Sequence, residues 1–250
     1  MESYNVSVII PIHNAKSTFG RSVTSVLAQE NIPKNVKEIY VICVLNACSE
    51  EDAGEYSNIA NSGVTRERDE RFCISLTSEP EKGIVPALNT GLGIAKRHNS
   101  KYIFRQDADD FWYPNKMAKQ LEFLDTNPEV DILGTGIRFV NTSFEPGGNF
   151  LYPETDQEIK ANMLSGRNSI AHPTVAFRSS ILKHTGGYDD TFPFAEDFSL
   201  WLRCIKWHKF ANLGEILLDY TQNPNPNYTP LSPQIAASNA AVALRYFGAK

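Results

Sequence analysis

Short apolar runs alternate with stretches of helical periodicity along the first half of the chain. Four such runs are typical of strands buried on both faces, at residues 6–12, 38–45, 72–77 and 102–104. The helical spacing is clearest for Val85, Leu88, Leu92 and Ala95. Strands that alternate with helices form largely parallel sheets, because each crossover helix packs on a face of the sheet. We therefore expect an α/β protein of three layers, α/β/α, with a mainly parallel central sheet.

The pattern changes after about residue 130. It predicts strands at 130–140 and 174–177 and helices at 156–164 and 196–207. An Asn-Pro-Asn-Pro-Asn stretch from residue 223 predicts an extended linker, and an Ala-rich helix is expected at 235–246. We expect one domain over 1–222, followed by this linker and helix over 223–250.

Composition and charge narrow the class of protein. The 250 residues carry a net charge of −5 with dispersed Lys and Arg, which argues against a nucleic-acid-binding surface. No apolar stretch approaches the roughly 18–20 residues that span a bilayer. The four cysteines form no CxxC pair, and the start lacks the features of a secretory signal. We therefore expect a cytoplasmic protein with no transmembrane segment and no nucleic-acid partner.

The acidic stretch Asp107-Ala108-Asp109-Asp110 carries the strongest chemical signal. It directly follows a predicted strand, and open α/β sheets bind ligands at the carboxyl ends of their strands. Clustered carboxylates repel one another unless a cation offsets their charge, and Mg²⁺ and Mn²⁺ favour such oxygen ligands. The sequence therefore suggests a metal site here. The alternative is a solvated acidic turn in which Asp110 caps the next helix.

A second acidic pair, Glu196-Asp197, lies among aromatic residues at the start of a predicted helix. Helix capping and the helix dipole explain such a pair without any function. The functional alternative is a general base in a partly apolar pocket, and such a base contributes about 10²–10⁴-fold to rate. His172 precedes a predicted strand, and its role as a structural histidine or as a diphosphate or metal contact stays open.

Other nucleotide-binding and hydrolase motifs fit poorly. Gly91 and Gly93 lack a third glycine and lie on a helix face instead of in a strand–helix turn. The chain has no glycine-rich phosphate loop ending in Gly-Lys-Ser or Gly-Lys-Thr, and no Gly-x-Ser-x-Gly elbow.

Taken in order, these stretches resemble the inverting GT-A glycosyltransferases of family 2, the type found in bacterial polysaccharide synthesis. The resemblance runs from about residue 6 to residue 220. Its pieces are the strand and turn at 8–14, the loop and helix at 82–91, Asp107-Ala108-Asp109 as a D-x-D motif, the stretch 114–134, His172-Pro173-Thr174, Gly186-Gly187-Tyr188-Asp189, and 195–202. Each piece is weak alone, whereas the ordered set is specific.

The resemblance implies a GT-A fold of the nucleotide-diphospho-sugar transferase type, and metal-dependent, inverting sugar transfer to an acceptor hydroxyl. It assigns the nucleotide-sugar to residues 1–130 and the acceptor to 131–222. The residues implied for donor binding are Pro11, His13, Asn14, Asn46, Lys82, Asn89 and Asp107. The implied ligands of Mn²⁺ or Mg²⁺ are Asp109, Asp107 and His172. Asp197 is the implied general base, with Glu196 as the alternative.

One departure from the family concerns the nucleotide base. The family often carries an Asp at the end of the second strand that contacts uracil, and Leu45 stands there in this chain. Asn46 is the neighbouring candidate for that contact. A UDP-sugar is the first expectation for the donor, and GDP- and dTDP-sugars stay open. The expected acceptor is a glycan or lipid-linked sugar, with peripheral contact at the inner face of the membrane left open.

Two other functions remain to be distinguished. A nucleotidyltransferase would carry a Gly-rich basic loop after the first strand, where this chain has Pro-Ile-His-Asn, and it would release pyrophosphate. A non-catalytic nucleotide- or sugar-binding module would bind the donor without hydrolysis or transfer.

Overall fold

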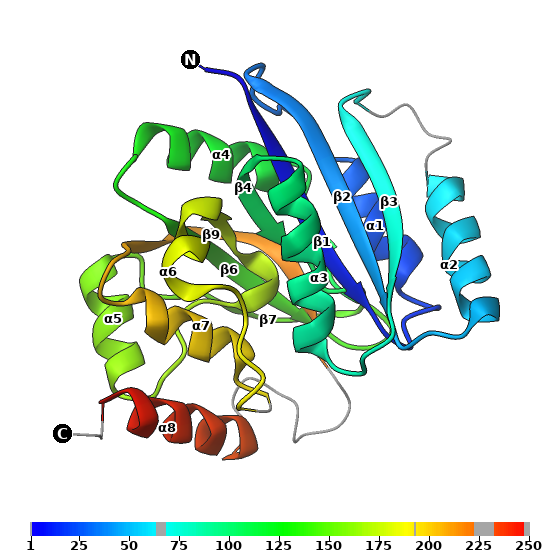
Figure 1. Cartoon of the computed structure of the whole chain (residues 1–250). Coiled ribbons are helices and arrows are strands. Elements are labelled where there is room, and N and C mark those ends of the chain that lie inside the picture. The colour runs from blue at the N-terminus through cyan, green and yellow to red at the C-terminus, as the bar shows by residue number, and fades with distance from the viewer. Residues whose placement is uncertain (1, 64–68, 193, 223–232, 248–250) are drawn as a thin grey trace.

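The computed structural model describes residues 2–63, 69–192, 194–222 and 233–247. Within these residues a single nine-stranded sheet has the strand order β3-β2-β1-β4-β8-β6-β9-β5, and β7 pairs with β6 outside this path. Helices cover both faces of the sheet (Figure 1). The fold is a three-layer α/β/α sandwich, which confirms the expected architecture.

The first four long strands are parallel neighbours and form one side of the sheet, with β3 at its edge. They are β1 (Tyr4–Ile12), β2 (Val36–Asn46), β3 (Phe72–Glu79) and β4 (Ser100–Arg105). The helices that connect them are α1 (Phe19–Leu27), α2 (Glu50–Gly63) and α3 (Ile84–Arg97). All four strands predicted from apolar runs are therefore confirmed, each a few residues longer than its apolar run.

The second half of the sheet is mixed. β8 (Ala176–Arg178) runs antiparallel to both β4 and β6 (Ile132–Val140), whereas β9 (Phe210–Thr221) runs parallel to β6. The short strands β5 (Phe111–Trp112) and β7 (Pro146–Phe150) add antiparallel pairs. The sequence analysis did not predict β5, β7 or β9. The strand expected at 174–177 begins later, because a 3₁₀ turn, η1 (His172–Thr174), occupies its start.

Two apolar cores lie between the sheet and the helices, one on each face of the sheet. Phe19 of α1, Tyr56 of α2 and Leu121 of α4 (Lys116–Thr126) belong to the core on one face. The other core receives side chains from α3, α5 (Asp156–Leu164), α7 (Glu196–Cys204) and α8 (Pro233–Phe247). The helix predicted at 156–164 is confirmed with those bounds, and the helix predicted at 196–207 ends earlier, at Cys204. Between η1 and α7 lie the short elements η2 (Ser179–Ile181) and α6 (Leu182–Thr185).

The domain boundaries at 130 and 222 stay predictions. The sheet itself does not divide at residue 130, since β8 pairs with β4. The predicted linker at 223–232 lies outside the described residues. The helix predicted at 235–246 is confirmed as α8, and Val242 is buried against the second core.

The turns after β1 and β2 share a backbone feature. Asn14 has φ of 52° and Ala47 has φ of 49°, both in the left-handed region. Asn tolerates this conformation because its short polar side chain can bond locally, whereas Ala pays a steric cost of about 1–2 kcal/mol. Ala47 is therefore held in place by its surroundings, in particular by the hydrogen bond from its amide to the carbonyl of Glu79 (2.8 Å).

We expect Ala47→Gly to stabilise the protein. Glycine removes the steric cost at positive φ but loses more chain entropy on folding, which leaves a net gain of about 0.5–1 kcal/mol. Thermal unfolding should report a rise of roughly 1–4 °C for a chain of this size. Ala161→Gly, on the exposed side of α5, is the matched control and should shift the melting temperature downward. Equal shifts for both variants would contradict the argument.

Candidate active site

The acidic turn follows β4 directly, at the carboxyl edge of the parallel strands. One carboxylate oxygen from each of Asp107, Asp109 and Asp110 lies within 4.8 Å of the others. Distant elements hold the turn. The Ser22 hydroxyl of α1 donates to the Asp107 carbonyl (2.7 Å). Thr221 at the end of β9 donates its hydroxyl to the Asp109 carbonyl (2.5 Å) and its amide to Asp110 Oδ1 (2.8 Å).

The electrostatics of this turn favour a cation. Burial, followed by the charge of Asp107, raises the pKa of Asp109 to about 6. Burial and the two neighbouring carboxylates raise the pKa of Asp110 well above its usual range. Asp110 Oδ2 is buried and has no hydrogen-bond partner. A set of three hard oxygen donors with such destabilised charges fits Mg²⁺ or Mn²⁺.

Glu196 and Asp197 form the first turn of α7. Asp197 accepts hydrogen bonds from Asn168 Nδ2 (2.8 Å) and from the Phe198 amide (2.6 Å), which fix its orientation. Burial raises the pKa of Asp197 to about 6. Burial and then the charge of Asp197 raise the pKa of Glu196 to about 7. Helix capping explains part of this arrangement, because Asp197 accepts a hydrogen bond from a first-turn amide. The burial of both carboxyls and their raised pKa values are additional features that capping does not require.

Arg105 links the two acidic groups, and the sequence analysis did not identify it. Its side chain is buried at the end of β4 and forms an ion pair with Asp107. Its charge also partly offsets the rise in pKa that burial causes at Asp109 and Asp197. Its Nε atom is buried without a partner. The signal in the sequence was a single arginine at the end of a mostly buried strand, two residues before the acidic motif.

His172 lies on the α7 side of the site. Its Nε2 atom is 2.9 Å from the Tyr188 hydroxyl, and its Nδ1 atom is 4.0 Å from Glu196 Oε1. Burial, and then the charge of Arg105, lowers the pKa of His172 well below its usual range, so the ring is neutral at pH 7. Among the described residues, the group of clustered ligand atoms contains the three aspartates and not His172. Its role as a metal ligand stays a prediction.

The stability of the protein should fall as pH rises through the pKa values of the second acidic pair. Glu196 and Asp197 titrate near 4 in an unfolded chain but near 7 and 6 when folded, so the folded state binds more protons between these values. The stability that this pair contributes is fully present below about pH 4, where both carboxyls are protonated. It is lost by about pH 7, where both carboxyls must be buried as charged groups.

The variant Glu196→Gln tests this pH dependence. It should unfold at a higher temperature than wild type at pH 8 in the absence of metal, because it removes a buried charge worth roughly 1–3 kcal/mol. At pH 4 the difference should vanish. The exposed Glu122→Gln serves as control and should behave like wild type at both pH values. An identical shift for Glu196→Gln at pH 4 and pH 8 would contradict the expectation.

The residues predicted for donor binding lie partly at the ends of β1 and β2 and partly in the loop before α3 and in α3 itself. Pro11 is buried in β1, whereas His13 and Asn14 are exposed in the turn after it. His13 Nδ1 lies 3.0 Å from the Asn46 carbonyl, and its Nε2 lies 3.1 Å from Asn14 Nδ2. Lys82 is exposed in the loop before α3. The structure brings His13, Asn14 and Asn46 together at the ends of β1 and β2.

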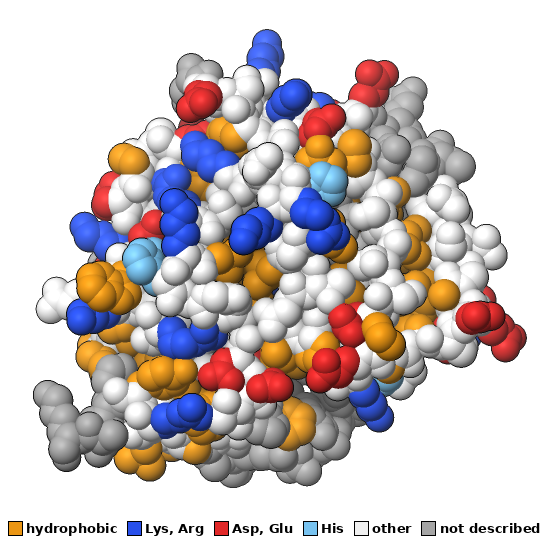
Figure 2. All heavy atoms as spheres, viewed as in Figure 1, with side chains coloured by type: hydrophobic (Ala, Val, Ile, Leu, Met, Phe, Trp, Pro, Cys, Tyr) orange, Lys and Arg blue, Asp and Glu red, His pale blue; other side chains and the backbone are white. Residues whose placement is uncertain are grey.

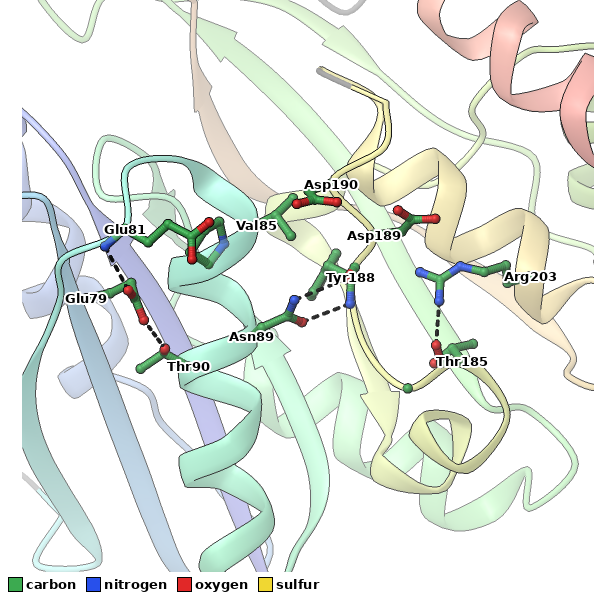
Figure 3. Close-up of a pocket in the computed structure, with 12 residues that line it drawn as sticks. Glu79, Glu81, Val85, Asn89, Thr90, Thr185, Tyr188, Asp189, Asp190 and Arg203 are labelled. Atoms are coloured by element: carbon green, nitrogen blue, oxygen red, sulfur yellow. Dashed lines mark hydrogen bonds between the residues drawn. The ribbon is translucent and has the colours of Figure 1, made fainter.

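Asn46 and Asn89 brace loops. Asn46 donates to the Glu81 carbonyl (2.7 Å) and accepts from the Gly83 amide (3.0 Å), so both ends of its amide are occupied. Asn89 of α3 bonds the Tyr188 carbonyl and amide in the same way (3.0 and 2.9 Å), as Figure 3 shows. Gly187, at φ 121°, permits this approach, because a Cβ there would lie 2.7 Å from Asn89 Oδ1. A donor contact for either asparagine stays a prediction.

Two cavities open near these residues. One of about 350 Å³ lies at the ends of β1 and β2 and is lined by Asn14, Lys16, Ser17, Ala47, Cys48, Asp52 and Tyr56. A larger one of about 710 Å³ lies between the start of α3 and the loop before α7 (Figure 3). Its walls include Glu79, Glu81, Asp189 and Asp190. Acidic side chains gather at the lower centre of the face drawn in Figure 2, below the lower end of α3.

The solved structures that share this fold are GT-A-type transferases. The chain has this fold and belongs to glycosyl transferase family 2, whose family model matches residues 7–186. It is therefore a glycosyltransferase. Within the described residues, none of the helices combines the length and apolar character needed to cross a membrane.

Three known proteins illustrate the likeness. The chain is 30% identical over 224 residues to the Escherichia coli UDP-Glc:alpha-D-GlcNAc-diphosphoundecaprenol beta-1,3-glucosyltransferase WfgD, covering 88% of this chain and 78% of that protein. S. aureus TarS 1-349 in complex with UDP-GlcNAc gives a TM-score of 0.62 at 18% identity, over 98% of this chain and 66% of that chain. The mannosyltransferase PcManGT from Pyrobaculum calidifontis, in complex with GDP-Man and Mn²⁺, gives 0.63 at 15% identity, over 100% of this chain and 74% of that chain.

Proposed function

We propose that the protein transfers a sugar from a nucleoside-diphosphate sugar to a hydroxyl of a glycan or lipid-linked acceptor, in the synthesis of a polysaccharide or surface glycan. The observation that carries the proposal is the pairing of two carboxylate groups of different chemistry around the buried Arg105. Asp107, Asp109 and Asp110 form an oxygen cluster suited to a cation. Glu196 and Asp197 have pKa values near neutrality, as a general base requires.

The donor would bind over the carboxyl edge of β1, β2 and β4. His13 and Asn14 would line the base and ribose pocket, and Lys82 and Asp107 would approach the ribose and diphosphate. Asp109 and Asp107 would hold Mn²⁺ or Mg²⁺. When bound, the cation offsets the negative charge that develops on the departing diphosphate. The complexes of TarS with UDP-GlcNAc and of PcManGT with GDP-Man and Mn²⁺ support this class of donor and cofactor.

Asp197 is the general base of the proposed reaction. The acceptor oxygen attacks the anomeric carbon, the bond from that carbon to the diphosphate oxygen breaks, and the hydroxyl proton passes to the Asp197 carboxylate. A single displacement of this kind inverts the anomeric configuration. Burial raises the pKa of both carboxyls, so the pair gains a proton closer to neutral pH than free carboxyls do. The hydrogen bonds from Asn168 and the Phe198 amide hold that carboxylate in place.

The name of WfgD describes transfer of glucose from UDP-Glc to a lipid-linked diphosphate sugar, and this supports an acceptor of the same class. The choice among UDP, GDP and dTDP, the cytoplasmic location and the peripheral membrane contact remain predictions.

Product analysis tests the proposal. The protein is incubated with UDP-, GDP- and dTDP-sugars, with and without Mn²⁺, and with lipid-linked or free glycan acceptors. We expect release of a nucleoside diphosphate that depends on both the metal and the acceptor. Pyrophosphate as the product would favour a nucleotidyltransferase instead. Donor binding without hydrolysis or transfer would favour a non-catalytic binding module.

A further inference from the structure

The smaller cavity, at the ends of β1 and β2, has a wall made from two stretches of the chain, the turn after β1 and the turn after β2 with the helix α2 that follows it. Asn14 and Ala47 contribute from the turns after β1 and β2, and both have left-handed backbone conformations. Asp52 and Tyr56 contribute from α2. Strained non-glycine backbone persists mainly where the surroundings enforce it, and it gathers at binding sites. A volume of about 350 Å³ lies at the lower end of the range for small-ligand pockets.

Only two charged side chains line this cavity among the described residues. Lys16 Nζ lies 2.5 Å from Asp52 Oδ1, and it also lies 2.7 Å from Glu55 Oε2 outside the wall. The side chains of Lys16 and Asp52 are 45% and 35% exposed, so a ligand can reach both. The pair presents a hydrogen-bond donor, the Lys16 ammonium, beside an acceptor, the Asp52 carboxylate. A ligand that binds both must offer an acceptor and a donor in the complementary order.

The end of β2 itself provides no free side-chain acceptor for a base. Leu45 is buried in the core, with 4% of its surface exposed. Both ends of the Asn46 amide are bonded to the loop before α3. Asp52 is therefore the one carboxylate in the cavity wall that a nucleotide base can reach.

We propose that Lys16 and Asp52 read the hydrogen-bonding edge of the donor's base and select bases in which a ring N–H lies beside a carbonyl. This inference rests on the proposed function. The Asp52 carboxylate accepts from the ring N–H, and the Lys16 ammonium donates to the adjacent carbonyl oxygen. Uracil, thymine and guanine present this order. Cytosine and adenine present an unprotonated ring nitrogen beside an amino group, so each would face Asp52 and Lys16 with the wrong polarity.

Calorimetric titration of the full chain with UDP, GDP, dTDP, CDP and ADP, in the presence of Mn²⁺, tests the inference. Wild type should bind at least one of UDP, GDP and dTDP at least about tenfold more tightly than CDP and ADP. Asp52→Asn should weaken that preferred nucleotide by about 10- to 100-fold, as expected for a lost hydrogen bond to a charged group, and leave CDP unchanged or tighter. Lys16→Gln should reduce the same selectivity.

Glu55→Gln is the matched control, because Glu55 contacts Lys16 without lining the cavity. It should retain wild-type selectivity. Wild type that binds CDP as tightly as UDP, GDP or dTDP would overturn the base-reading assignment while leaving the proposed function intact. An equal loss of all five nucleotides in Asp52→Asn would also overturn it, since a general defect does not discriminate bases. Absence of binding by every nucleoside diphosphate would overturn the proposed function as well.

Discussion

Replacing Asp109 by Asn is expected to reduce sugar transfer by about 10²–10³-fold or more and to abolish the metal dependence of nucleotide binding. One carboxylate oxygen of Asp109 lies within 4.8 Å of an oxygen of Asp107 and of Asp110, and burial followed by the charge of Asp107 raises the pKa of this carboxyl. Removing it takes away an ionic oxygen ligand and one third of the negative charge that attracts a divalent cation. Without that cation, the charge that develops on the leaving diphosphate is offset much less.

The measurement is nucleoside diphosphate release over a titration of Mn²⁺, together with calorimetric binding of the preferred nucleotide. Loss of the fold is distinguishable, because Asp109→Asn removes a buried charge and should melt no lower than wild type at pH 8 without metal. Glu129→Gln, an exposed carboxylate on the surface after α4, is the control and should transfer normally. Full activity of Asp109→Asn at limiting Mn²⁺ would remove the aspartate turn from the reaction.

The variant Asp197→Asn should lower turnover by about 10²–10⁴-fold while the dissociation constant of the donor nucleotide stays within a fewfold of wild type. The amide keeps the size of the side chain and can still accept from the Phe198 amide, but it cannot take the acceptor proton. Below about pH 6, wild-type kcat/KM should fall about tenfold per pH unit, because only the ionised carboxylate acts as the base.

Glu196→Gln is the comparison that assigns the base. It should retain more activity than Asp197→Asn, since only Asp197 is oriented by the side chain of Asn168 and the amide of Phe198. The reverse order of activity would transfer the role of general base to Glu196. A flat pH profile for Asp197→Asn, together with an acid limb that Glu196→Gln retains, would confirm that the limb belongs to Asp197.

The sequence predicted those parts of the fold that depend on local periodicity. The continuous apolar runs of β1, β2 and β4 indicated buried strands, and the helical face of α3 indicated its crossover. β9 was not predicted because Gly214 and Glu215 interrupt its apolar pattern, and only its pairing with β6 and β5 makes it a strand. β7, with Gly147 and Gly148, is exposed throughout and carries no apolar signal.

The candidate site was also predicted only in part, and the part that was found is local in sequence. The acidic motifs after β4 and at the start of α7 are contiguous in sequence, so they were found there. The partners that tune them come from far along the chain. Asn168 bonds Asp197 across 29 residues, and Thr221 bonds Asp110 across 111 residues. Likewise, the sequence named Asn46 as a candidate base contact but gave no sign that the loop before α3 occupies its amide. The individual roles of these residues in donor binding remain predictions.

The dependence of the acidic turn on Thr221 has a consequence for synthesis of the chain. A ribosome completes residues 107–110 more than a hundred residues before Thr221 emerges to hold the Asp109 carbonyl and the Asp110 carboxylate. Until β9 joins the sheet, the turn lacks the clamp that brings its three carboxylates together. An unfinished chain that lacks Thr221 therefore does not yet have these two hydrogen bonds, although the acidic turn itself is already synthesised.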